Sequence, residues 1–111
     1  MVSERIANYR EFWPYYLREH ARAGTRAIHY FGTGLVLIFA VIAIAARQWA
    51  LLFLLPLAGY GPAWFAHFFV EKNRPATFRY PLWSLISDFR MFFIWISGGM
   101  PRELSRAGIA S

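Results

Sequence analysis

The sequence predicts an all-α integral membrane protein: a helical hairpin with an N-terminal amphipathic helix and a C-terminal interfacial or re-entrant helix, about four helices in all. Three observations predict it. The chain of 111 residues is 58% hydrophobic and 20% aromatic, too apolar for an ordinary soluble domain. Two long apolar segments follow each other across a short polar break. Upstream of them, apolar residues recur at helical spacing. Residues 1–111 are expected to form one membrane-embedded domain, with a flexible tail over residues 103–111.

The first helix is expected over residues 3–20. Its apolar residues follow at steps of three or four and so share one face; they are Ile6, Tyr9, Trp13 and Tyr16. His20 continues this series, so it belongs to the buried face. Ser3 is a suitable N-cap, and Pro14 predicts a kink. The following sequence ARAGTR, which contains Gly24, predicts a break or turn.

Two apolar segments, residues 29–46 and 49–70, are each long enough to span a membrane. Only Arg47 and Gln48 separate them, so the two helices must be antiparallel neighbours. Small residues in both segments would allow close helix contact in lipid. They are Gly32, Gly34, Ala58, Gly59 and Gly61.

The chain beyond the hairpin is predicted to turn and then form one more helix. Pro75 and Pro81 exclude a continuous helix between the second span and residue 82. Residues 82–96 are apolar and aromatic but contain Asp88 and Arg90, which makes the segment too short and too charged for a confident span. We expect an interfacial or re-entrant helix, with these two charges on a polar side at headgroup level.

Charge predicts the orientation. The formal net charge is +6, but the arginines flank the apolar segments and form no single basic face, so an anionic membrane surface is a better partner than nucleic acid. Five arginines precede the first span, one lies at the hairpin tip, and six lysines and arginines follow the second span. The positive-inside rule then places both termini in the cytoplasm. The membrane would be the inner membrane of a bacterium or the endoplasmic reticulum of a eukaryote.

The three histidines, His20, His29 and His67, are expected to converge at the cytoplasmic end of the hairpin, with Glu71 one turn after His67 on the same helix face. Neutral imidazoles with a carboxylate suit a first-row divalent metal, and sites of this type with open positions suit iron(II) and oxygen chemistry. The alternative is a set of interfacial histidines hydrogen-bonded to backbone or headgroups, with Glu71 paired to a neighbouring basic residue. The absence of cysteine excludes thiolate metal sites, disulfides and cysteine nucleophiles.

Three arginines are candidates for binding a substrate carboxylate, because a guanidinium can hold a carboxylate with two parallel hydrogen bonds. They are Arg26, Arg74 and Arg90.

Two stretches of the sequence resemble the signature segments of a family of small membrane proteins, the "metabolism of phytosphingosine" family. They are YYLREHARAGTRAIHYFGT and GPAWFAHFFVEKNRPATF. The resemblance covers about residues 10–95. Its most specific element is His67 followed by Glu71, Lys72, Arg74 and Pro75.

The resemblance implies an activity. The fungal member of the family resides in the endoplasmic reticulum and is an iron(II)-dependent dioxygenase of 2-hydroxy fatty acids, which acts in fatty-acid α-oxidation. The implied partners are a 2-hydroxy fatty acid, dioxygen and membrane lipid. The implied catalytic and metal-binding residues are His20, His29 and His67, with Glu71 as a fourth ligand or as a partner of one. An open polar site on a single hairpin also suggests a homodimer that closes the pocket.

Two other functions remain open from the sequence. The first is a non-catalytic membrane protein that binds anionic lipid or an envelope partner through its basic interface. The second is a different metal-dependent lipid enzyme, such as a zinc hydrolase. A metal-free purified protein would favour the first, and activity without oxygen would favour the second.

Overall fold

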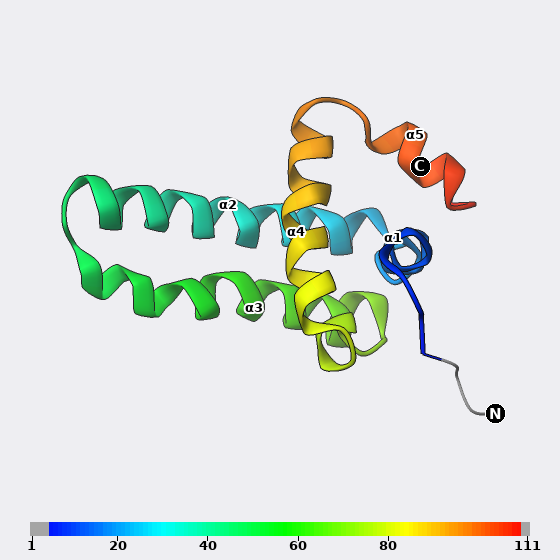
Figure 1. Cartoon of the computed structure of the whole chain (residues 1–111), viewed down its shortest axis with the longest axis horizontal. Coiled ribbons are helices and arrows are strands. Elements are labelled where there is room, and N and C mark those ends of the chain that lie inside the picture. Colours follow the sequence, from blue (N-terminus) through cyan, green and yellow to red (C-terminus); the bar gives the residue numbers. More distant parts are fainter. Residues whose placement is uncertain (1–4, 110–111) are drawn as a thin grey trace.

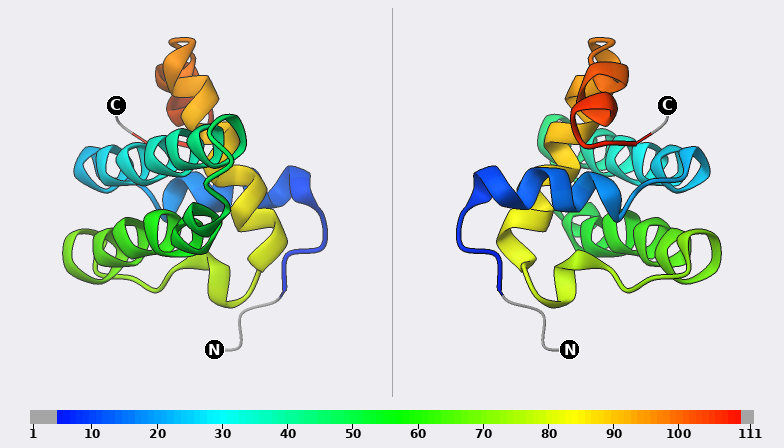
Figure 2. Two further views of the ribbon diagram at one scale, coloured as in Figure 1. Left: turned by 90° about the vertical axis from the view of Figure 1, so that its left-hand side faces the viewer. Right: turned by 90° about the vertical axis from the view of Figure 1, so that its right-hand side faces the viewer.

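The computed structural model describes residues 5–109. Within these residues all regular structure is helical, which confirms the all-α class. Figure 1 shows α2 and α3 side by side as a hairpin, with α4 crossing both of them. The helix α1, seen end-on in Figure 1 and from its side in Figure 2, runs across the open end of the hairpin. The predicted hairpin with flanking helices is therefore confirmed.

The first leg of the hairpin is α2 (Ala23–Ala45). The second leg consists of η1 (Trp49–Leu54), α3 (Leu55–Phe65) and η2 (Ala66–Glu71), a π-helical turn. A tight turn joins the legs, and Arg47 adopts a positive φ of 53° in it.

The break predicted in ARAGTR is confirmed at Ala21 and Arg22, which lie between α1 and α2, but it ends before Gly24, where α2 is already helical. The reason lies far along the chain. One carboxylate oxygen of Glu71 accepts hydrogen bonds from the backbone N–H of Arg22, at 3.0 Å, and from the hydroxyl of Thr25, at 2.7 Å. These contacts place a negative charge and an acceptor at the N-terminus of α2, where a helix needs both. A non-local contact therefore starts α2 before its apolar segment begins.

The two legs approach closely at Gly32. A Cβ atom at this position would lie 2.9 Å from the carbonyl oxygen of Ala58 and 3.3 Å from Pro62. The absence of a side chain thus allows the backbones to meet, as the small residues in the sequence predict.

The helix α1 (Tyr9–Arg18) packs its aromatic face against α4, α5 and the segment between α3 and α4. Asn8 is its N-cap, and its side chain accepts a hydrogen bond from the N–H of Glu11 at 2.9 Å. The N-cap predicted at Ser3 lies outside the described residues. The core of this region contains aromatic and apolar side chains from α1, α4, α5 and the segment between α3 and α4; it includes Phe12, Trp13, Tyr16, Leu17, Tyr80, Met91 and Leu104.

The last two helices are α4 (Pro81–Ile96), where a helix is predicted, and α5 (Met100–Arg106). The sequence predicts a flexible tail from residue 103, but helix α5 continues through residue 106. Leu104 is buried, and the indole N–H of Trp13 donates to the carboxylate of Glu103 at 2.8 Å. This packing against α1 orders the segment; residues 110–111 lie outside the described part.

Two helical stretches, Ala23–Ala45 and Trp49–Glu71, are long and apolar enough to cross a membrane. Only 22% and 17% of their apolar windows are buried within the chain, unlike the mostly buried core helix of a soluble protein. Phe53 at the tip side of the hairpin is 86% exposed. The hairpin therefore presents a continuous apolar surface that the rest of the described chain does not cover.

The close approach at Gly32 predicts that Gly32→Ala lowers the melting temperature of the purified protein in detergent. The added methyl group meets backbone at 2.9 Å, and overpacking of this kind costs about 1–3 kcal/mol. Gly61→Ala is the matched control. Its Cβ would meet only a Leu57 side-chain carbon at 3.7 Å, so its melting temperature should stay the same or rise. Equal melting temperatures for the two variants would contradict the close approach.

Candidate metal centre

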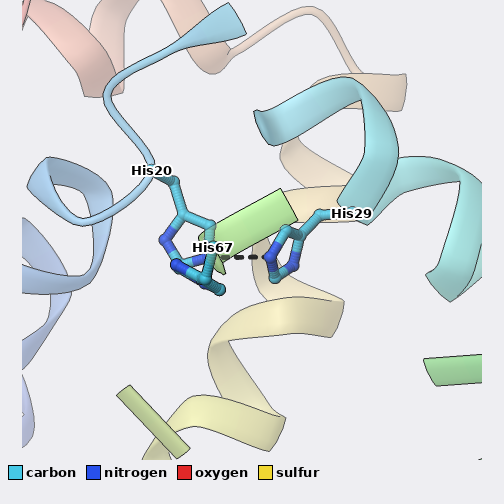
Figure 3. Close-up of side chains that lie close together, drawn as sticks. All are labelled: His20, His29 and His67. Atoms are coloured by element: carbon cyan, nitrogen blue, oxygen red, sulfur yellow. Dashed lines mark hydrogen bonds between the residues drawn. The ribbon is translucent and has the colours of Figure 1, made fainter. Parts of the chain in front are cut away.

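Three buried histidines from three different elements meet at the open end of the hairpin (Figure 3). His20 follows α1, His29 lies on α2 and His67 lies in η2. The Nε2 atom of His20 lies 3.2 Å from Nε2 of His29 and 3.0 Å from Nε2 of His67. One ligand atom from each ring lies within 4.8 Å of the other two. The convergence predicted from the sequence is thus confirmed; we call these residues the histidine trio.

The Nδ1 atoms of two of these rings face oxygen acceptors. His20 Nδ1 lies 2.7 Å from the carbonyl oxygen of Tyr16, which can only accept. His29 Nδ1 lies 3.6 Å from a carboxylate oxygen of Asp88. Nδ1 of His20 therefore carries its hydrogen, and the carboxylate of Asp88 favours a hydrogen on Nδ1 of His29.

The third ring is oriented by an amide. His67 Nδ1 lies 2.7 Å from Oδ1 of Asn73. The amide nitrogen of Asn73 donates to the carbonyl oxygen of Glu19 at 3.0 Å, which fixes the orientation of the amide and leaves Oδ1 to accept. Nδ1 of His67 therefore also carries the hydrogen, and its Nε2 is free of one.

This arrangement fits a bound cation. With hydrogen on each Nδ1, the Nε2 lone pairs of His29 and His67 face Nε2 of His20 at 3.2 and 3.0 Å, and a cation between the three nitrogens would accept all three lone pairs. Imidazole Nε2 is a common ligand of iron, zinc and other first-row metals. The donor set suits such a metal without selecting among them.

The cavity lined by the trio supports the same conclusion. Its volume is about 10 Å³, space for one small species. Ser84 also lines it, and its buried hydroxyl oxygen has no hydrogen-bond partner in the described part of the chain. An unsatisfied buried hydroxyl costs about 1–3 kcal/mol, so a ligand in this cavity would have a polar group to satisfy.

The position of Asp88 differs from the one predicted from the sequence. The sequence places it on a headgroup-level polar side, whereas its side chain is only 17% exposed and faces His29. It also accepts a hydrogen bond from the hydroxyl of Tyr16. Burial raises the pKa of Asp88 above its ordinary value, and burial with the nearby Asp88 charge raises the pKa of Tyr16. The phenol of Tyr16 therefore stays protonated, and its O–H group donates the hydrogen bond to Asp88.

The electrostatics around His20 follow from burial as well. Burial, together with the two neighbouring imidazoles, holds the pKa of His20 well below its ordinary value. A neutral ring is the form that binds a metal.

Glu71 is not part of the group of ligand atoms formed by the trio among the described residues. Its carboxylate instead binds the start of α2 through Arg22 and Thr25. Glu71 therefore holds the N-terminus of α2 in place, at Thr25, which lies one helical turn before His29. Its role as a direct metal ligand remains a proposal.

The three candidate arginines do not line the cavity of the trio. Arg26 is buried and donates from Nη1 to the carbonyl oxygens of His20 and Ala21, both at 2.9 Å, which fixes the backbone at His20. Arg90 is exposed, with its guanidinium 4.1 Å from the ring centroid of Trp13. Arg74 is exposed beside Pro75, which does line the cavity.

Comparison with known proteins decides the family. A family model described as "2-hydroxy-palmitic acid dioxygenase Mpo1-like" matches residues 6–100. The chain belongs to this family. The match confirms the resemblance seen in the two histidine-containing segments, and it spans the trio together with Asn73, Ser84 and Asp88. No curated protein and no solved structure gives a significant match to the chain.

We expect His67→Ala to remove the bound metal, because a buried ligand that supplies one of three nitrogens is lost. Protein loaded anaerobically with iron(II) should contain about one metal per chain, and the variant close to none, by elemental analysis. Glu71→Ala should keep the metal and lose about 1 kcal/mol of stability, as a lost helix cap does. Metal loss in Glu71→Ala equal to that in His67→Ala would instead make Glu71 a ligand.

Asp88→Asn is expected to weaken metal binding by about 10–100-fold, since a group that orients a ligating imidazole loses its charge while keeping its size. The measurement is competition for the metal with a chelator of known affinity. Glu103→Gln is the matched control, because this carboxylate binds Trp13 away from the trio. An affinity unchanged by Asp88→Asn would show that the 3.6 Å contact to His29 has no role in metal binding.

Proposed function

We propose that the chain is a membrane-embedded, iron(II)-dependent dioxygenase that shortens 2-hydroxy fatty acids by one carbon with release of carbon dioxide. The observation that carries the proposal is the buried trio of inward-facing Nε2 atoms, found in a chain of a 2-hydroxy-palmitic acid dioxygenase-like family. His20, His29 and His67 would hold the metal, with Glu71 positioning α2 or completing the ligand set. Iron(II) would supply the one-electron steps that dioxygen needs to react with a closed-shell substrate.

The overall reaction balances without a further co-substrate. It is R–CH(OH)–COOH + O2 → R–COOH + CO2 + H2O. Conversion of the hydroxy acid to the shortened acid and carbon dioxide releases four electrons, which is the number that complete reduction of dioxygen requires. The reaction therefore needs no nucleotide cofactor beside the metal.

Residues of the chain prepare the site before substrate binds. Tyr16 through its carbonyl, Asn73 and Asp88 hold the three rings in place, so little reorganisation is needed when a charge enters. The free hydroxyl of Ser84 is available to hydrogen-bond the polar end of a substrate. The remaining walls are largely apolar and exclude water; they include Ala63, Trp64, Pro75 and Ala76.

The location of the trio suits an amphipathic substrate. The trio lies at the open end of the hairpin, opposite the tip (Figure 1). Arg47 is the one arginine at the tip, and the other arginines come before or after the apolar segments of the hairpin in the sequence. We infer that the hairpin spans the membrane with both termini in the cytoplasm, so that the trio lies near the cytoplasmic headgroups. A fatty acid keeps its carboxylate at this depth, where Arg26, Arg74 and Arg90 add positive charge.

Oxygen consumption tests the proposal. Iron(II)-loaded protein given 2-hydroxypalmitic acid should consume about one O2 per CO2 released and form pentadecanoic acid, as the balanced reaction requires. Palmitic acid should not be turned over, and His67→Ala should be inactive. Iron-loaded protein that consumes no oxygen with 2-hydroxy acids would contradict the proposal. Hydrolysis of an ester or amide lipid by the zinc-loaded protein under anaerobic conditions would replace it with a metal-dependent hydrolase.

A further inference from the structure

An apolar groove begins beside the trio and lies between α2, α3 and α4. Its volume is about 330 Å³. Its lining comes from all three helices: Thr33 and Val36, then Leu55, Pro56, Gly59 and Tyr60, then Leu85, Asp88 and Phe89. Asp88 also lines the cavity of the trio. The groove and the candidate metal centre therefore share a wall.

The groove leads from the trio toward the hairpin tip. On α2, Thr33 is about one turn beyond His29 and Val36 about one turn further, so Val36 lies about 10 Å along the helix from His29. On the antiparallel leg, Tyr60 and then Leu55 lie progressively further from His67 in the same direction. Figure 1 shows α4 crossing both legs, and three residues of α4, Leu85, Asp88 and Phe89, line one side of the groove.

The two legs are in contact beside the groove, at Val36 and Gly59. A Cβ atom at Gly59 would lie 3.3 Å from Cγ2 of Val36, so the space beside Val36 exists because residue 59 has no side chain. Asp88, in the wall shared with the trio, is the charged residue of the lining, whereas Val36, Leu55 and Pro56 line the part nearer the tip. This polarity matches a molecule with one polar end and one long apolar tail.

We propose that this groove binds the acyl chain of the substrate, with the methyl end between Val36 and Leu55, and that these two residues set the chain length. The inference rests on the proposed function and adds the site of the tail and its specificity. A membrane lipid with two acyl chains fits less well, because a groove of about 330 Å³ has room for a single chain. A single-chain acid can enter the groove sideways from the bilayer.

Binding of acids of two lengths tests the proposal without relying on turnover. Zinc-loaded protein in phosphatidylcholine nanodiscs is titrated with 2-hydroxypalmitic acid and with 2-hydroxyoctanoic acid, whose shorter tail should end before Val36. Val36→Phe should weaken binding of the longer acid about fifteenfold, the equivalent of about two methylenes left unburied. Binding of the shorter acid should not change.

Ile38→Phe is the matched control, because Ile38 lies on the same helix but is 54% exposed and does not line the groove. It should bind both acids like the unmodified protein. An equal effect of the two variants, or equal weakening of both acids by Val36→Phe, would overturn the proposal.

A second pair of variants covers the case in which Val36→Phe does not fold. Leu55→Ala should increase the affinity for 2-hydroxystearic acid relative to 2-hydroxypalmitic acid, because it lengthens the groove; Leu57→Ala, at a 69% exposed position, should not. No change in this ratio for Leu55→Ala would overturn the proposal. Length-dependent binding without oxygen consumption by the iron-loaded protein would support the groove and contradict the proposed reaction. Oxygen consumption by the iron-loaded protein, with no effect of the groove variants on binding, would support the proposed reaction and overturn the groove as the site of the acyl chain.

Discussion

The orientation of three imidazole rings is the constraint on which the rest of the structure depends. Each ring needs an oxygen at its Nδ1 side if its Nε2 lone pair is to face inward, and each oxygen comes from a different place. The carbonyl oxygen of Tyr16 in α1 faces the ring of His20. Oδ1 of Asn73, in the turn after η2, faces the ring of His67, and a carboxylate oxygen of Asp88 in α4 faces the ring of His29. With hydrogen on each Nδ1, the three Nε2 lone pairs face one another, an arrangement that a bound cation would stabilise.

Several elements of the fold contribute to the placement of the three imidazole rings. The negative charge of Glu71 starts α2 early enough to place His29 at the open end. The π-helical turn carries His67, and the left-handed conformation of Lys72, with φ of 65°, then returns the chain so that Asn73 reaches back to the ring. π-Helical turns are often found at functional sites, because they change which side chains face inward. The aromatic packing of α1 on α4 and α5 fixes the segment that leads into His20.

The parts that the sequence predicts are those set by local pattern. Helical spacing in α1, the two apolar lengths and the short break between them predict the hairpin, and an antiparallel hairpin brings His29 and His67 to one end. Asp88 and Asn73 escaped prediction because their roles depend on how α4 crosses the hairpin and how the chain turns after η2. An acidic residue in a largely apolar helix was the one sequence signal that pointed to Asp88. The early start of α2 and the order of α5 rest on Glu71 and Leu104, through contacts distant in sequence that no local rule contains.

In this arrangement His20, His29 and His67 would together hold one metal ion through their Nε2 atoms. X-ray absorption spectroscopy of the iron(II)-loaded protein in nanodiscs tests this most directly, because imidazole ligands give a characteristic outer-shell scattering that can be counted. We expect a signal from three imidazoles, which falls to two or disappears in His67→Ala. A metal coordinated only by oxygen, with no imidazole scattering and no response to the His67 substitution, would contradict it.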